Sequence, residues 1–368
     1  MINPDILISI ADRFKPQGTI LDLQAHGNGN VNDTFLVTLD GRKGKKFILQ
    51  RLNTRVFRRP ELVMQNIRAF ITHNHNHRPS SPLSLGRRWE VPLLSLTKDG
   101  QDHFIDVDGS FWRAFSFIEH TRSFETIQHV GHAQEVGYAL GKFHSLVSDL
   151  PINQLADTLE GFHITPGYLR HFDQILAKWR PKKSPEVEYG LGFIEKGRIW
   201  AGILEEAKEQ GKLPLRPIHG DPKVNNVLID RTTHQAVSLI DLDTVKPGLI
   251  HYDIGDCLRS GCNPWGEDTG KWEAVRFETD LCRAILQGYL AQAKCFLLEN
   301  DYEYLFESIR LIAFELGLRF FTDYLEGNVY FKVGHEAQNL FRALVQFKLT
   351  ESIESQESEI RAVIREIR

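Results

Sequence analysis

One segment of this chain differs in pattern from the sequence on both sides of it. Residues 216–245 contain two short runs rich in apolar and β-branched residues, which predict strands. The stretches 190–210 and 271–299 around it carry the apolar spacing of helices. An island of strands in a helical region must be joined by loops, and loops on a rigid support are where binding and catalytic residues concentrate. We therefore expect the functional residues in this island.

The length of the chain indicates two lobes. With 368 residues it exceeds the size of about 250–300 residues at which a single hydrophobic core stops growing. Hydrophobic residues make up 42% and charged residues 25% of the chain, which is ordinary for a globular protein and excludes a disordered chain. The sequence thus predicts two packed lobes with a cleft between them.

The two parts of the chain differ in predicted secondary structure. The first part predicts a five-strand antiparallel sheet with one helix, from strands at 19–25, 34–39 and 46–52, a helix at 60–74 and strand patterns between 89 and 120. After about residue 119 the pattern is mainly helical, with helices expected at 131–147, 168–179, 190–210, 271–299, 302–325 and 350–368. We expect an α+β fold with an N-terminal lobe of residues 1–118 and a mainly helical C-terminal lobe of residues 119–368.

The charge balance narrows the range of partners. The 44 Lys and Arg residues stand against 48 Asp and Glu residues, a formal net charge of −4, and there is no long basic tract. Nucleic acid is therefore not expected as a partner. The first residues lack the features of a signal peptide, and no stretch reaches the roughly 18–20 uncharged apolar residues of a membrane helix. We expect a cytoplasmic protein with no membrane partner; the sequence does not indicate its oligomeric state.

The island carries polar residues at a characteristic spacing. It reads His219-Gly220-Asp221, continues to Asn226, and has Asp241 on the next predicted strand. This arrangement resembles the catalytic loop and metal-binding strand of the aminoglycoside phosphotransferase and choline kinase-like superfamily, which is related to the protein kinases. The resemblance implies a protein-kinase-like bilobal fold and the transfer of a phosphoryl group from ATP, with Mg²⁺, to an alcohol.

The same resemblance implies a role for each polar residue. Phosphoryl transfer needs an oriented nucleophile and cations that neutralise the phosphates. Asp221 would accept the proton of the acceptor hydroxyl or orient that hydroxyl, and Asn226 and Asp241 would supply oxygen ligands to Mg²⁺. Asp243 would ligate a second ion, hold a metal-bound water, or instead anchor a loop. Lys223 would contact the transferred phosphate or remain a solvated charge.

Further residues near the island would support it. His219 is expected to be a structural hydrogen-bonding group rather than a base. Asp253 lies in YDIGD, which resembles the superfamily segment whose aspartate braces the catalytic loop. The sequence contains neither an intact D-F-G nor an A-P-E, so a protein-kinase activation loop, and with it a protein substrate, is not expected.

A glycine-containing turn precedes the second predicted strand. Glycine lets backbone N–H groups approach phosphate oxygens, which makes Gly27, Gly29 and Asn30 candidates for nucleotide binding. The same residues would also make a good hairpin turn. Their position two strands ahead of a kinase-type catalytic loop favours the phosphate-binding interpretation.

The third strand and the segment between the lobes complete the expected nucleotide site. A cation on the third strand should reach the phosphates, and Arg51 stands where a protein kinase has lysine. Gln50 takes this place if the register is shifted by one residue, because neighbouring residues on a strand face opposite sides. Ile118 lies in the expected linker, whose backbone would bind adenine.

Segments spread over nearly the whole length resemble the N-acetylhexosamine 1-kinases, among them HGNGNVNDTFLV, SLIDLDTVKPGLIHYDIGD and GLRFFTDYLEGNVYFKV. The resemblance implies that the anomeric hydroxyl of N-acetylglucosamine or N-acetylgalactosamine is phosphorylated to a sugar 1-phosphate. Arg319 could donate hydrogen bonds to the sugar, and Tyr330 offers a ring face and a hydroxyl. A salt bridge for Arg319 and core packing for Tyr330 are the alternatives, and Asp323 either pairs with Arg319 or contacts the sugar.

Other functions stay open on the sequence alone. The same catalytic loop would serve a kinase of the aminoglycoside, choline, ethanolamine or homoserine type. A nucleotide-binding scaffold without turnover is a further alternative. The presence of Asp221, Asn226 and Asp241 together favours an active enzyme.

Overall fold

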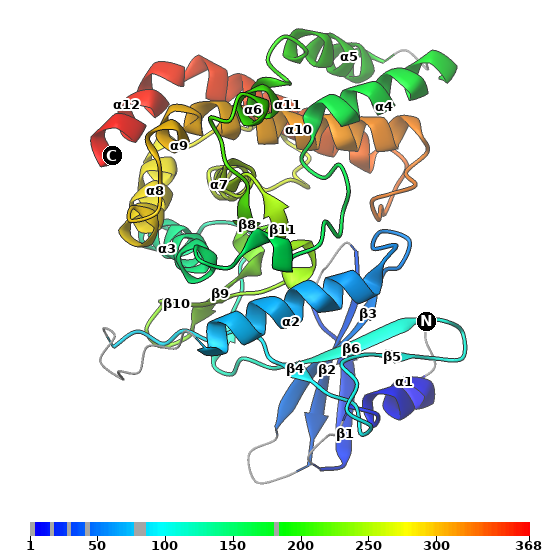
Figure 1. Cartoon of the computed structure of the whole chain (residues 1–368). Coiled ribbons are helices and arrows are strands. Elements are labelled where there is room, and N and C mark those ends of the chain that lie inside the picture. Colours follow the sequence, from blue (N-terminus) through cyan, green and yellow to red (C-terminus); the bar gives the residue numbers. More distant parts are fainter. Residues whose placement is uncertain (1–3, 15–17, 28–30, 41–44, 77–85, 180–183) are drawn as a thin grey trace.

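The chain folds into a part built around a β-sheet and a larger helical part (Figure 1). The structure is a computed structural model that describes residues 4–14, 18–27, 31–40, 45–76, 86–179 and 184–368. The elements of the sheet part are α1 (Pro4–Ala11), β1 (Ile20–Ala25), β2 (Asp33–Leu39), β3 (Lys46–Leu52), α2 (Pro60–Asn76), β4 (Leu94–Ser95), β5 (Phe104–Ile105) and β6 (Phe111–Ser116).

The sheet is antiparallel and follows the order β1-β2-β3-β6-β4, with β5 also paired to β6. Strand β3 pairs along the whole of one edge of β6. On the other edge, β4 pairs with Ala114 and Phe115, and β5 pairs with Phe111 and Trp112. The two short strands therefore lie end to end. The sheet contains six strands, but it is only five strands wide because β4 and β5 share the same edge of β6. The sequence predicts five strands.

Two helices cover opposite faces of the sheet. Leu7 and Ile10 of α1 pack in a small core with Trp112 of β6. On the other face, Ile67 and Phe70 of α2 belong to a core that continues into the helical part. The Phe70 ring stacks on a phenylalanine of that part at 5.3 Å between centroids. The sequence patterns did not predict α1.

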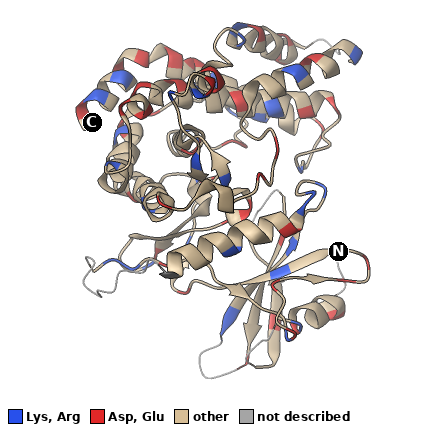
Figure 2. Ribbon diagram, in the orientation of Figure 1, with Lys and Arg blue, Asp and Glu red and all other residues tan. Residues whose placement is uncertain are grey.

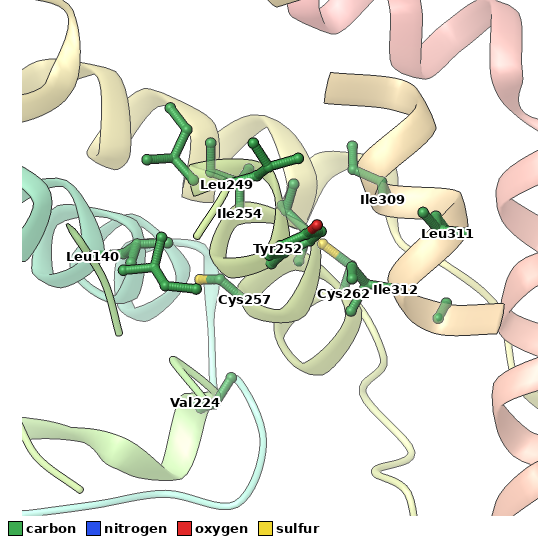
Figure 3. Close-up of a cluster of buried hydrophobic side chains, with 14 of the residues drawn as sticks. Leu140, Val224, Leu249, Tyr252, Ile254, Cys257, Cys262, Ile309, Leu311 and Ile312 are labelled. Atoms are coloured by element: carbon green, nitrogen blue, oxygen red, sulfur yellow. The ribbon is translucent and has the colours of Figure 1, made fainter. Parts of the chain in front are cut away.

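Helix α7 (Ile250–Gly261) lies at the centre of the helical part, between α3 (Val130–Val147) and α10 (Leu305–Leu325) (Figure 3). Helices α3 and α8 (Thr279–Ala293) pack backbone to backbone: a Cβ at Gly137 would collide with the Ile285 carbonyl, and one at Gly288 with the Gln134 carbonyl. The remaining helices are α4 (Thr165–Lys178), α5 (Pro185–Gly197), α6 (Ile203–Glu209), α9 (Glu299–Glu303), α11 (Gln338–Ser355) and α12 (Glu357–Ile367).

Some predicted helix boundaries differ from the structure. The helix expected at 190–210 is two helices, α5 and α6, and the break follows Gly197, where a Cβ would collide with the Phe314 ring. The helix expected at 271–299 begins only at Thr279. The C-terminal end holds two helices, the first of which begins at Gln338, ahead of the range expected.

The predicted island forms two small antiparallel ladders. Strand β8 (Arg216–Ile218) pairs with β11 (Lys246–Gly248), and β9 (Val227–Asp230) pairs with β10 (Ala236–Leu239) and with β7 (Thr121–Arg122). The loop 219–226 runs from β8 to β9, and the segment 240–245 runs from β10 back to β11. Because the two connections join the same pairs of ladders, they lie side by side.

Charged residues of both signs are interspersed over the two parts in Figure 2. Among the helices of the described ranges, none combines the length and the apolar character needed to cross a membrane.

Candidate active site

The loop 219–226 is shaped by a glycine that no other residue could replace without strain. Gly220 has φ +86°, in the left-handed region, and a Cβ there would lie 2.7 Å from the Thr244 carbonyl oxygen. The Thr244 hydroxyl donates to the His219 carbonyl oxygen at 2.8 Å. The loop is thus fixed against the segment that carries Asp241.

Asp253 braces this loop from α7, as the sequence predicts. Its buried carboxylate accepts hydrogen bonds from the backbone N–H groups of His219 and Gly220, both at 2.7 Å, and pairs with His144 Nε2 at 2.8 Å. Burial alone would raise the pKa of Asp253, but the hydrogen bond and charge of His144 outweigh it and lower that pKa. The carboxylate therefore stays ionised and holds both amides.

His219 is a structural group in this arrangement, also as predicted. Its Nε2 lies 3.0 Å from the Ile240 carbonyl oxygen, and its Nδ1 accepts from the Asp221 N–H at 3.3 Å. Burial lowers the pKa of His219. Both ring nitrogens are used in holding the loop, so the ring is not placed to act as a base.

Asp221 projects from the braced loop next to a cation and an amide. Lys223 Nζ lies 2.8 Å from Asp221 Oδ2, and Asn226 Nδ2 lies 3.3 Å from the same oxygen. Burial opposes the charge of Lys223, but the carboxylates of Asp221, Asp241 and Glu267 outweigh it and raise the pKa of Lys223. The lysine is therefore a permanent cation between two carboxylates of the loop region.

Asp241 lies beside this cluster, and among the described residues its carboxylate has no hydrogen-bond or salt-bridge partner. It adopts a left-handed conformation, φ 68° and ψ 59°, which is uncommon for a non-glycine residue and turns the side chain away from the strand direction. The residue is exposed at the surface, yet neighbouring protein atoms displace water around its carboxylate. This loss of water, with the charges of Asp243 and Asp221, raises the pKa of Asp241 to about 7. Bound cationic charge would relieve this repulsion.

Asp241 and Asn226 fit a magnesium ion. Asn226 donates through Nδ2 to the Asp221 carbonyl oxygen at 2.7 Å, which leaves its side-chain oxygen as the group available to a ligand. In the described ranges no three His, Cys, Asp or Glu side chains converge on a ready-made metal site. Mg²⁺ is usually held by one or two carboxylates together with substrate phosphates and water, so a sparse set of protein oxygens is what this ion requires.

Asp243 is held by the sheet part rather than left free. Its Oδ1 lies 2.5 Å from Arg113 Nη2, and its Oδ2 accepts from Asn32 Nδ2 at 2.7 Å. Both Arg113 and Asp243 are buried, so this is an ion pair shielded from water that joins β6 to the segment after β10. Of the interpretations given for Asp243, this geometry supports the anchoring one.

The two candidates on β3 lie on opposite faces of the sheet. Gln50 Oε1 accepts from Arg113 at 2.9 and 3.2 Å, so Gln50 lies on the face that reaches Asp243. Arg51 pairs with Asp33 at 2.5 Å on the other face, near the Trp112 ring. The cation on the sheet face toward Asp243 is therefore Arg113, which belongs to the neighbouring strand β6. Arg113 could have been recognised in the sequence as a cation between Phe111 and Phe115 on one face of the strand. A cation buried on an apolar face needs a charged partner, which marks it as a candidate.

The other candidates for nucleotide binding are partly described. Gly27 follows β1 with φ +76°, and the space beside it is open. Gly29 and Asn30 lie outside the described residues. Ile118 is buried just beyond β6, and its carbonyl oxygen accepts from the Thr121 hydroxyl at 2.8 Å.

Arg319 lies in a cage of aromatic rings. Its guanidinium carbon is 5.0 Å from the centroid of Phe162, 5.2 Å from Tyr168, 5.5 Å from Phe331 and 5.7 Å from Tyr330. In the described part of the chain the guanidinium has cation–π contacts but no hydrogen bond or salt bridge. The structure thus brings Arg319 and Tyr330 together, and it adds Phe162 and Tyr168, which no sequence pattern had singled out.

Asp323 shapes the loop that carries two of these rings. Its carboxylate accepts the backbone N–H groups of Val329, Tyr330 and Phe331 at 2.8, 2.7 and 3.0 Å, and also bonds Asn339 Nδ2 at 2.8 Å. Asp323 therefore pairs with the loop rather than with Arg319. The effect is to hold Tyr330 and Phe331 against the guanidinium.

Comparison with known proteins agrees with this site. Residues 22–292 match the model of a family described as "Phosphotransferase enzyme family". The chain is similar to the structure of a microcompartment-associated aminopropanol kinase, at 15% identity and a TM-score of 0.66 over 98% of this chain and 99% of that one.

Two further solved structures are similar. An aminoglycoside phosphotransferase from Alicyclobacillus acidocaldarius subsp. acidocaldarius DSM 446 is 15% identical, with a TM-score of 0.63 over 100% of this chain and 97% of that one. A choline kinase from Cryptosporidium parvum Iowa II is 14% identical, with a TM-score of 0.62 over 98% of each chain. The likeness confirms the α+β fold with a small antiparallel sheet and a mainly helical C-terminal part.

Proposed function

Because the chain belongs to the phosphotransferase enzyme family, we propose that it transfers the γ-phosphoryl group of ATP to a neutral sugar. The acceptor in this proposal is the anomeric hydroxyl of N-acetylglucosamine or N-acetylgalactosamine, and the product is the sugar 1-phosphate. The observation that carries the proposal is the Arg319 guanidinium, which lies among four aromatic rings without an acidic partner in the described ranges.

The Arg319 guanidinium, which has no acidic partner in the described ranges, disfavours cationic acceptors. Choline, ethanolamine and aminoglycosides carry positive charge, which Arg319 would repel across a poorly hydrated space. Four carboxylates near the catalytic loop already have partners of their own: Asp221 pairs with Lys223, Glu315 with His163, and Asp256 and Glu267 with Arg259. The carboxylate of Asp241 is assigned to Mg²⁺ in this proposal. A neutral sugar suits the site, since its hydroxyl and acetamido oxygens accept from the guanidinium and its apolar face packs on the rings.

The nucleotide in this proposal lies between the sheet and the catalytic loop. The phosphates lie near the sheet face that carries Gln50 and Arg113, and the amides of Gly27, Gly29 and Asn30 approach them. Arg51, on the other face, supports the strand through Asp33 instead. The backbone around residue 118 binds adenine, and this residue separates a nucleotide-binding lobe, 1–118, from a catalytic and acceptor-binding lobe, 119–368.

The residues of the loop then divide the chemistry. Asp221 orients the acceptor hydroxyl and accepts its proton as the bond to phosphorus forms. Lys223 offsets charge on the transferred group. Asp241 and Asn226 hold Mg²⁺, which when bound neutralises the nucleotide phosphates. Asp243 keeps its partners Arg113 and Asn32 and fixes the distance between the lobes.

An acceptor panel tests the proposal. ADP release would be followed with ATP, Mg²⁺ and one acceptor at a time: N-acetylglucosamine, N-acetylgalactosamine, galactose, glucose, choline, homoserine and kanamycin. We expect kcat/KM to be highest for an N-acetylhexosamine and turnover with choline and kanamycin to stay at the level without acceptor. Preferred use of choline, homoserine or kanamycin would refute a neutral-sugar pocket, and no turnover with any alcohol would favour a non-catalytic scaffold.

A further inference from the structure

His163 connects the catalytic loop to the helix that carries Arg319. It lies between the aromatic cage residue Phe162 and helix α4, with φ 64° and a side chain only 5% exposed. Its Nδ1 is 2.9 Å from Glu315 Oε1 on α10, and its Nε2 is 3.0 Å from the Gly220 carbonyl oxygen. The left-handed backbone conformation is unfavourable for a residue other than glycine. It persists only where the surrounding contacts impose it.

The partners of His163 define its protons. A backbone carbonyl oxygen and a carboxylate are both acceptors, so each ring nitrogen must contribute a proton to make its contact. The other carboxylate oxygen, Glu315 Oε2, accepts from the Thr165 hydroxyl at 2.7 Å. The hydrogen-bond pattern therefore calls for a doubly protonated imidazolium paired with an ionised Glu315, both inaccessible to solvent.

We propose that His163 is a positioning residue of the phosphotransferase, an imidazolium that fixes the Gly220–Asp221 peptide relative to α10. Glu315 lies one helical turn before Arg319, so the Gly220–His163–Glu315 contacts and one turn of α10 together link the catalytic loop to the acceptor cage. The distance between the acceptor hydroxyl and Asp221 depends on this link. The inference rests on the phosphotransferase activity of the family and not on which alcohol is the acceptor.

The groups that face His163 favour its charge. Burial opposes the charged form, but the carboxylate of Glu315, the Gly220 carbonyl and the charge of Asp256 outweigh burial and raise the pKa of His163. The Tyr252 ring of α7 stacks on the imidazole at 5.3 Å between centroids. No cation is in contact with the ring in the described part of the chain.

The first test replaces His163 with a residue that cannot make both contacts. His163→Gln has both of its donor hydrogens on a single nitrogen, which cannot reach Glu315 and the Gly220 carbonyl at the same time, so the loop should shift slightly with the fold intact. We expect kcat to fall about 10–100-fold, since displacements near 1 Å can cost about that much. The dissociation constant for ATP should change by no more than about twofold, because the loss concerns the transfer step. Activity is measured with whichever acceptor the wild-type enzyme uses in the panel, so failure of the sugar proposal does not affect the test.

A matched control uses another histidine–glutamate pair, which joins α4 to the residue just after α10. His171 Nε2 lies 3.2 Å from Glu326 Oε2, and the pair is exposed and away from the loop. His171→Gln should keep kcat within about twofold of wild type, as expected for an exposed pair. An unchanged kcat in folded His163→Gln would overturn the proposal.

The second test distinguishes positioning by a charged ring from a purely structural role. The active form holds the proton on His163, so kcat should fall as pH rises through its pKa. Glu315→Gln removes the charge that raises this pKa while keeping the side-chain volume. The high-pH limb of kcat should therefore move to lower pH by about one unit or more. A limb that stays at the wild-type pH in Glu315→Gln would contradict the proposal, even if His163→Gln cannot be obtained in folded form.

Discussion

Gly220 shows how one backbone position controls the chemistry beside it. Its left-handed φ of +86° and its contact with the Thr244 backbone leave no room for a side chain. Asp253 accepts the N–H of Gly220, and His163 contacts its carbonyl oxygen, so the two peptide groups that flank Gly220 are both held. The backbone that carries Asp221 is therefore fixed by Asp253 and His163.

At this scale the first prediction concerns Asp221→Asn. The amide cannot take the proton of the acceptor hydroxyl, so kcat should fall about 10²–10⁴-fold, the usual contribution of a positioned general base. The brace from Asp253 does not involve the Asp221 side chain, so ATP binding and the unfolding temperature should be retained. Steady-state kinetics and nucleotide titration of the same preparation check both points; a near-wild-type kcat would remove Asp221 from the mechanism.

Asp221, Asn226 and Asp241 lie close together because only short loops and short strands separate them in the sequence, so sequence distance translates directly into position. Their catalytic and metal-binding roles stay predictions, which come from the family resemblance and not from the spacing. Arg113 could not be assigned in the same way. Its role depends on Asp243, a residue of the other part of the chain, and only the packing of β6 against the segment after β10 brings the two charges to 2.5 Å.

At the scale of elements, α10 and the loop behind it form the wall of the proposed acceptor pocket. The helix supplies Arg319, and the carboxylate of Asp323 folds the following loop back so that Tyr330 meets the guanidinium. Three backbone amides converge on one buried side chain. The shape of the loop thus depends on that charge more than on the loop residues themselves.

Asp323→Asn should therefore weaken the hold on the loop after α10 without affecting nucleotide binding. Each hydrogen bond to a charged group contributes about 1.5–3 kcal/mol to the stability of the loop. If about 1.4 kcal/mol of this is lost from acceptor binding, the affinity for the acceptor falls tenfold. We expect the KM of the acceptor to rise about tenfold or more, while ATP affinity stays constant. Glu326→Gln, an exposed carboxylate at the end of the same helix, is the control and should leave KM nearly unchanged. An equal KM for Asp323→Asn and wild type would exclude this role.

The elements themselves were predictable where the apolar pattern was long and regular. Helix α10 was expected at 302–325 and is found at Leu305–Leu325. The break after α5 was missed, because it depends on the fit of Gly197 against the Phe314 ring, a contact between distant segments. The partner of Asp323 could not be predicted in the same way: the sequence left it open between Arg319 and a sugar, and the structure shows the backbone N–H groups of the loop after α10.

At the scale of the whole molecule, the two parts are joined through the site. Asp243 binds Arg113 and Asn32 of the sheet part. Asn66 of α2 adds a second connection, because its amide nitrogen donates to the Val245 carbonyl oxygen at 2.8 Å. Two lobes could be predicted from length and pattern alone. The contacts that set their distance could not, because each joins side chains far apart in the sequence.

Arg113→Met tests this connection. It leaves Asp243 buried without its cation, and breaking a buried ion pair typically costs about 3–5 kcal/mol of unfolding free energy. Arg51→Met is the comparison on the opposite face, where the partly exposed pair with Asp33 should contribute about 0–1 kcal/mol. Chemical denaturation measures both. A loss for Arg51→Met as large as that for Arg113→Met would contradict the role given to the buried Arg113–Asp243 pair in joining the two parts.

The most direct test of the proposed function is the position of the phosphate on the product. N-acetylglucosamine and its 1-O-methyl glycoside would be incubated in parallel with the enzyme, ATP and Mg²⁺, and the products examined by ³¹P–¹H correlation NMR. We predict phosphorus coupled to the anomeric proton for the free sugar, with loss of reducing-end reactivity in step with ATP consumed, and no phosphorylation of the glycoside. Phosphorylation of the glycoside, or a product that still reduces copper, would contradict anomeric transfer.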